Sequence, residues 1–273
     1  MTQPVMTPAG DGTALERARD LLAAEWLKLR TVRSSYLTVL AAAGVALFVA
    51  IGLARANVSG TVPHVGMGNL TDAVSDTFKG FGVAQLIMAV FGALSVTAEY
   101  GSGLIRTTLT ARPQRAEVLG AKVAVAGAVG LVTGEITALA CFWSTQAVFG
   151  PRHGGTSLWS PHVLPAVLGG GFYLGVVTVL GVGIGALIRH TAGALTVIVA
   201  FLYLVPDLGY ALPSPWKWDY ASAFPSTAAQ QITQVSVSPA SHLLGAGPSY
   251  AVLAGYSVAI PVAAAWLLRR RDA

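Results

Sequence analysis

The sequence predicts an all-α membrane protein with six transmembrane helices, an N-terminal amphipathic helix in the membrane interface, and both termini in the cytoplasm. The first observation behind this prediction is composition. Of the 273 residues, 54% are hydrophobic and only 11% are charged, whereas soluble domains carry about 25% charged residues. The second is that the apolar residues gather into six runs of about membrane-spanning length. The third is an uneven distribution of Lys and Arg between those runs.

The N-terminal part divides into a tail and an amphipathic helix. Residues 1–13 are rich in Pro, Gly and Thr, which predicts a disordered tail, and residues 14–273 are predicted to form one membrane domain. Within 14–33, apolar residues recur at steps of three and four: Leu15, Ala18, Leu22, Trp26 and Leu29. Charged residues, including Arg17, Arg19, Asp20, Lys28 and Arg30, occupy the rest of the helix surface, so we expect it to lie in the membrane interface. The same periodicity also fits a soluble helix that packs on a partner.

Six spans follow, and apolar length predicts each of them. They are residues 36–54, 80–98, 123–149, 164–188, 191–212 and 250–268. The first has no charged residue, and its length crosses ~30 Å of hydrocarbon at ~1.5 Å per residue. The third and fourth carry small residues three or four apart, which favours close helix packing. These residues are Gly127, Gly130, Gly134 and Ala138, then Gly171, Gly175, Gly181 and Gly185.

The fifth span is predicted to be irregular. Only 16 uncharged residues, from Thr191 to Pro206, precede Asp207, so we expect this span to be short or broken near its outer end. The following segment, 213–249, contains aromatic residues typical of a membrane interface, and residues 228–235 are predicted to form a short re-entrant or surface helix. The sixth span ends at three consecutive arginines, 269–271.

The basic residues predict the orientation. With the N-terminus inside, the inner segments hold 13 of the 17 Lys and Arg residues, and the outer segments hold Arg55, Lys79, Arg152 and Lys217. Cytoplasmic loops are enriched in Lys and Arg, so both termini are predicted to be cytoplasmic. The net charge of +5 is explained by this scatter between spans, and we predict no nucleic-acid partner.

Motif searches argue against catalysis by this chain. No G-x4-G-K-[ST] sequence that would cradle phosphates is present. The His and Cys residues lack the spacing of a metal site, and no nucleophile motif occurs. We therefore predict no enzyme activity, no metal and no cofactor bound by this chain.

Glu135 is the one acid well inside a predicted span. An acid at that depth is costly unless it is paired or faces water, so it is a functional candidate. It could line a cavity, gate a path or carry a proton. Alternatively, a protonated or hydrogen-bonded Glu135 could hold helices together.

The most informative charged stretch is EYGSGLIRTTLTARPQRAEVLGAK, residues 99–122, between spans two and three. Together with the entry motif Glu25-Trp26-x-Lys28-Leu29-Arg30, it resembles the permease subunit of ABC-2 type transporters, in the form common in actinobacteria. The resemblance covers nearly the whole chain after about Leu21. It implies a cell-membrane exporter with two permease halves, identical or different, and a separately encoded ATP-binding subunit that holds ATP and Mg²⁺.

The resemblance also implies roles for individual residues. The interfacial helix would be marked by Glu25, Trp26, Lys28 and Arg30, in contact with membrane lipid. The segment after span two would be the coupling helix that docks on the ATPase. Its residues are Glu99, Tyr100, Arg106, Thr107, Thr108, Arg112 and Arg115.

Two other functions stay open from the sequence. One is a proton-coupled secondary transporter that uses Glu135, although six spans without a detectable repeat fit that class poorly. The other is a membrane protein that does not transport a substrate and acts as an assembly or resistance factor.

Overall fold

The computed structural model describes residues 13–60, 73–104, 114–150, 155–213, 216–235 and 244–270. Within these ranges the chain is helical and has no strand. Six of the described helical segments are long and apolar enough to cross a membrane. The predicted all-α membrane fold with six spans is therefore confirmed. The side on which the termini lie and the interfacial position of the first helix stay predictions. The predicted disordered tail, residues 1–13, lies almost entirely outside the described residues.

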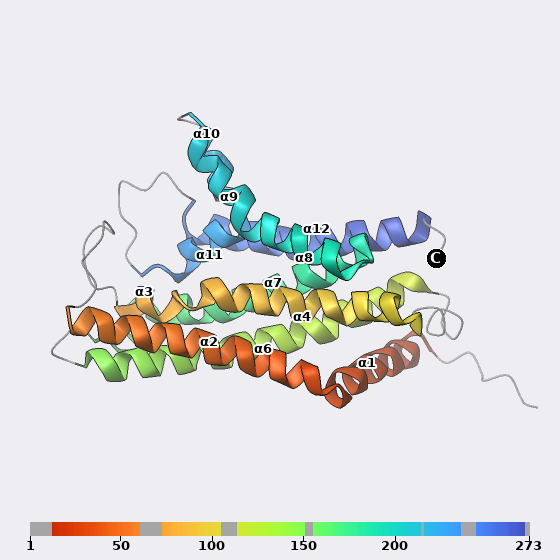
Figure 1. The fold of residues 1–273 in the computed structure, drawn as a ribbon, viewed down its shortest axis with the longest axis horizontal. Helices are drawn as coiled ribbons and strands as arrows, with labels where there is room; N and C mark the ends of the chain where they lie inside the picture. Colours follow the sequence, from red (N-terminus) through yellow and green to blue (C-terminus); the bar gives the residue numbers. More distant parts are fainter. Residues whose placement is uncertain are drawn as a thin grey trace, which may run out of the picture.

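Four long helices form the body of the bundle (Figure 1). They are α2 (Arg33–Val58), α4 (Phe81–Ser102), α6 (Arg115–Phe149) and α7 (Val163–Ile188). Helix α12 (Ala246–Arg270) packs on α7 from another side. The shorter α1 (Ala14–Thr31) joins α2 at an angle, at the end of the bundle where α12 also ends. We call this end the α1 end and the opposite one the far end.

Helix α7 is the centre of the bundle, and most of its residues are buried. It packs against α4, α6 and α12. The contacts are close because glycines face backbone: a Cβ on Gly181 would lie 2.0 Å from the Ala89 oxygen of α4, and one on Gly134 of α6 would lie 2.3 Å from the Gly171 oxygen. The prediction that small residues of spans three and four mediate close helix packing is confirmed.

The fifth span is irregular, as predicted. It consists of α8 (Thr191–Val199), a π-helical turn (Ala200–Leu204), α9 (Val205–Leu208) and a 3₁₀ turn (Gly209–Ala211). The irregularity begins at Ala200, before the proline that suggested it. Pro206 itself lies at the start of α9, directly after the π-helical turn, and it has no N–H to donate to that turn.

Short helices gather at the far end. They are α3 (Ala73–Phe78), α10 (Trp216–Ser222) and α11 (Pro225–Thr233). Helix α3 lies in the outer segment between the first two predicted spans, and its Asp76 accepts a hydrogen bond from the Asn57 side chain of α2. Helix α11 corresponds to the helix predicted over 228–235 and packs against α7 and α12.

The helices extend beyond the apolar runs from which the spans were predicted, most of all around the charged stretch 99–122. Helix α6 begins at Arg115 rather than at Val123, and α4 continues to Ser102. The apolar runs are shorter than the helices because polar residues at the ends stay helical. As a result Glu99, Tyr100 and Lys122 lie on helices, and the connecting loop is shorter than the charged stretch 99–122.

Candidate functional site

Helix α1 is fixed at its start and along its length. The Thr13 hydroxyl accepts a hydrogen bond from the Glu16 N–H, and the Glu16 carboxylate accepts one from the Thr13 N–H at 2.7 Å. This reciprocal cap satisfies two N–H groups that a helix start leaves free. Further along, Leu21 packs against Val118 and Ala121 of α6. This packing fixes the orientation of α1, so that the next turns on the same face point toward α4 and α6.

Four charged side chains from three helices meet on that face, and we call them the ion-pair network. They are Glu25 and Lys28 of α1, Glu99 of α4 and Lys122 of α6. The Lys122 ammonium lies 2.8 Å from Glu25 Oε2 and 2.7 Å from Glu99 Oε1. The Lys28 ammonium lies 2.7 Å from Glu25 Oε1 and 2.9 Å from Glu99 Oε1. Each lysine thus bridges both carboxylates.

Because the ion-pair network is largely buried, it stabilises only one relative position of the three helices. The Lys122 side chain is only 3% exposed, and its ammonium also donates to the Ser95 carbonyl at 3.3 Å. The two positive and two negative charges balance. Buried ions interact strongly but are costly when left unpaired, so α1, α4 and α6 are stabilised only where all four groups meet. Glu99 Oε2 is buried without a hydrogen-bond partner among the described residues.

Lys28 is the accessible member, with 42% of its side chain exposed. Partial burial acts to lower the pKa of its ammonium, but hydrogen bonds to Glu25 and Glu99 and the charges of both carboxylates outweigh burial. The pKa of Lys28 is therefore raised above its ordinary value. Lys28 therefore stays charged at neutral pH.

A second set of contacts surrounds the network at the α1 end. The Arg189 guanidinium, in the turn between α7 and α8, lies 5.5 Å from the centre of the Tyr100 ring on α4. Arg115, at the start of α6, donates to the Leu268 carbonyl of α12 at 3.3 Å. These contacts extend the connection from α1, α4 and α6 to α7 and α12.

The structure separates the residues predicted for coupling. Glu99 is in the ion-pair network, and Tyr100 and Arg115 are in the surrounding contacts, all on helices. Arg106, Thr107, Thr108 and Arg112 lie outside the described residues. The described chain stops just after Gly103, whose φ of +73° ends α4, and resumes at Gln114. Glu99 thus lies one turn before the end of α4, and Lys122 lies two turns after the start of α6.

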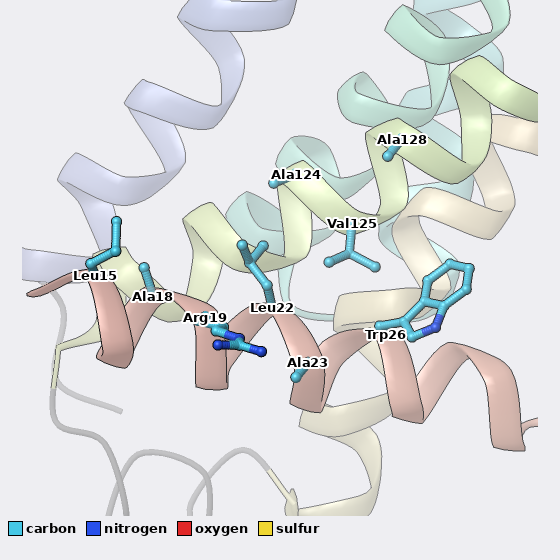
Figure 2. Close-up of a pocket in the computed structure, with 9 residues that line it drawn as sticks. All are labelled: Leu15, Ala18, Arg19, Leu22, Ala23, Trp26, Ala124, Val125 and Ala128. Atoms are coloured by element: carbon cyan, nitrogen blue, oxygen red, sulfur yellow. The ribbon is translucent and has the colours of Figure 1, made fainter. Parts of the chain in front are cut away.

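The residues predicted for the interfacial helix also fall into two groups. Glu25 and Lys28 face the bundle and form ion pairs. Trp26 and Arg30 are exposed, which fits the predicted contact with lipid. Trp26 also lines an apolar groove between α1 and α6 (Figure 2).

Glu135 lies on α6 where this helix crosses α7. A Cβ on Gly171 would overlap its carboxyl group, at 2.4 Å from Cδ, so the glycine makes room for the side chain. Glu135 Oε2 is buried without a hydrogen-bond partner among the described residues, although the residue as a whole is partly exposed. Both roles considered for Glu135, in a path or between helices, stay predictions.

Lys122 is the member of the network for which no role was predicted. Its charge placed it in a predicted loop, and its acidic partner Glu25 is 97 positions away. A signal was nevertheless present: Glu99 directly follows a predicted span and Glu25 lies in the predicted interfacial helix, both at the same predicted side of the membrane as Lys122. Among the residues that the structure describes, no cluster of His, Cys, Asp and Glu could hold a metal ion.

Comparison with known proteins adds one finding. The family model described as "ABC-2 family transporter protein" matches residues 21–207, from α1 to α9. The matched range contains the whole ion-pair network and more than half of the chain. No curated protein matches the chain. Six membrane-spanning helices and this match agree, and the chain is therefore a multi-pass membrane protein that belongs to the ABC-2 family of transporter proteins.

Proposed function

We propose that the chain is one permease half of an ABC exporter in the cell membrane. A separate subunit binds ATP and Mg²⁺ and hydrolyses the nucleotide, and a second permease half, identical or different, completes the transporter. The termini and the α1 end lie in the cytoplasm. Family membership supports a role in transport, and the Lys and Arg residues concentrated at the α1 end support this orientation.

The observation that carries the proposal is the ion-pair network. Its members flank the segment between α4 and α6, which is the segment that docks on the ATP-binding subunit. A displacement of that segment reaches Glu99 at the end of α4 and Lys122 near the start of α6. Because both residues also hold Glu25 and Lys28, α1 moves with them. The network thus makes three helix ends respond as one body to the ATPase.

A reconstituted complex with the co-expressed ATP-binding subunit tests this role. Lys28→Met removes the accessible ammonium and leaves the buried Lys122 pairs in place, so the complex still assembles. We expect the amount transported per ATP hydrolysed to fall several-fold. Lys79→Met removes a lysine at the far end, between α3 and α4, and serves as the matched control with an unchanged ratio.

Two results would contradict the proposal at different levels. An unchanged transport-to-hydrolysis ratio in Lys28→Met shows that the network does not couple the helices, although the chain remains a permease. Transport by the chain alone, driven by a proton gradient without any ATP-binding subunit, shows that the assignment to an ABC exporter is wrong.

A further inference from the structure

The groove in Figure 2 lies beside the contacts that hold α1 to α6. On one side of α1, Leu21 packs against α6 and Glu25 pairs with Lys122. On the neighbouring face the two helices diverge and leave an open groove of about 600 Å³. Because the groove lies next to the ion-pair network, a molecule bound in it would affect the angle between α1 and α6.

The groove is lined mainly by apolar side chains of unequal size. Leu15, Leu22 and Trp26 extend from α1, while α6 contributes the smaller Ala124, Val125 and Ala128, which leave space between the helices (Figure 2). The three α1 side chains are 81%, 39% and 52% exposed in this chain. An apolar surface of this kind needs a cover other than water.

One charged residue, Arg19, lines the groove. Figure 2 shows its guanidinium beside the α1 ribbon rather than extended toward the alanines of α6. The groove is therefore apolar along α6 and positively charged at its α1 edge. An occupant that complements both parts has an apolar chain and an anionic group at one end.

We propose that the groove binds an anionic phospholipid of the cytoplasmic leaflet. Its acyl chain lies between Leu22 and Trp26 of α1 and Ala124 and Ala128 of α6, and its phosphate is bound by Arg19. The cytoplasmic leaflet is the leaflet rich in anionic lipid, so this inference rests on the proposed orientation of the α1 end. The bound lipid acts as a wedge that sets how far α1 stands from α6.

Quenching of tryptophan fluorescence tests the site directly, because brominated acyl chains quench a tryptophan only on contact. The chain has six tryptophans. One full-length variant keeps only Trp26, and a second keeps only Trp143, which is 59% exposed on α6 and does not line the groove. Both are reconstituted in phosphatidylcholine vesicles with increasing fractions of brominated phosphatidylglycerol or brominated phosphatidylcholine.

We expect Trp26 to be half quenched at a several-fold lower fraction of brominated phosphatidylglycerol than of brominated phosphatidylcholine. Trp143 should show the same dependence on both lipids. Arg19→Gln in the Trp26 variant should abolish the preference. Arg30→Gln removes the same charge from an exposed position of α1 outside the groove, and should retain the preference.

Three outcomes would overturn the proposal. Equal quenching of Trp26 by both lipids indicates ordinary lipid contact without a headgroup site. Equal loss of preference in Arg19→Gln and Arg30→Gln indicates general attraction of anionic lipid to a basic helix. Absence of quenching by either lipid indicates that protein, such as a second permease half, covers the groove. None of these results bears on whether the chain couples to an ATPase.

Discussion

Lys122 illustrates how a single residue sets the position of three helices. Its ammonium is nearly inaccessible and contacts Glu25, Glu99 and the Ser95 carbonyl. Without it, two buried carboxylates share only Lys28, which is half exposed. A charge left unpaired in a buried site is much more costly than the loss of an exposed ion pair.

At this scale we predict that Lys122→Met lowers the free energy of unfolding by about 3–5 kcal/mol, because it leaves an uncompensated buried charge. Lys28→Met should cost about 1 kcal/mol or less, because its pairs are partly solvated. Unfolding of the purified chain in mild detergent, followed by circular dichroism, measures both values.

The double variant Lys122→Met/Glu25→Gln is the control for this interpretation. It removes one negative charge together with the positive one, so it should recover a substantial part of the lost stability. If the double variant is as unstable as the sum of the two single variants, the loss arises from packing around Lys122 and not from its charge.

At the scale of elements, the contact between α4 and α7 depends on the absence of side chains. A Cβ at Gly181 would meet the Ala89 carbonyl oxygen at 2.0 Å, and backbone cannot move aside as a flexible side chain does. The two helices would have to separate or shift along each other, although many residues of both are buried and closely packed.

We therefore predict that Gly181→Ala destabilises the chain by about 1–3 kcal/mol, the usual cost of overpacking. Gly44→Ala on α2 is the matched control, since a Cβ there has nothing within 4 Å and alanine favours helix. Thermal unfolding of the two variants in the same detergent compares them. Equal midpoints would mean that α4 and α7 adjust without cost.

At the scale of the whole molecule, six spans place both termini on the same side of the membrane. Among the described residues, the α1 end carries most of the basic side chains, including Arg30, Arg115 and Arg189, while the far end has Arg55 and Lys79. The preference of Lys and Arg for the cytoplasm predicts the orientation.

Cysteine labelling checks this orientation. The one native cysteine, Cys141, is buried and is replaced first, as Cys141→Ala. In that background we predict that Ser157→Cys, before α7 at the far end, reacts with a membrane-impermeant maleimide added to intact cells. Ser102→Cys, at the end of α4, should react only after the cells are opened. Both serines are exposed, and the reverse pattern would invert the proposed topology.

The sequence was sufficient for the spans because each is a long apolar run with polar ends. It also predicted the irregular fifth span from Pro206, although the π-helical turn at Ala200–Leu204 has no comparable signal in the residues themselves. The close glycine contacts followed from spacing alone, since small residues three or four apart share one helix face.

The ion-pair network was less accessible to prediction. Its four members were visible as charges in the sequence. Lys122 is buried, however, because α6 already begins at Arg115, so that this residue lies within the helix and packs beside α1 and α4. Helix ends defined by apolar runs stop short of such polar turns. Pairing across 97 and 23 positions depends on how helices pack, which local pattern does not determine. Arg106 and Arg112 lie outside the described residues, and their docking role stays a prediction.

The position of α7 has a consequence for the route of the transported molecule. A helix occupies the axis of this bundle, and its glycines bring the neighbouring backbones into contact with it. The interior of the single chain is therefore filled by protein. We expect a solute to cross the bilayer along an outer surface of the bundle, where the facing surface of another subunit closes the path. The path would then open and close by sliding or tilting of whole bundles, with the packing inside each bundle unchanged.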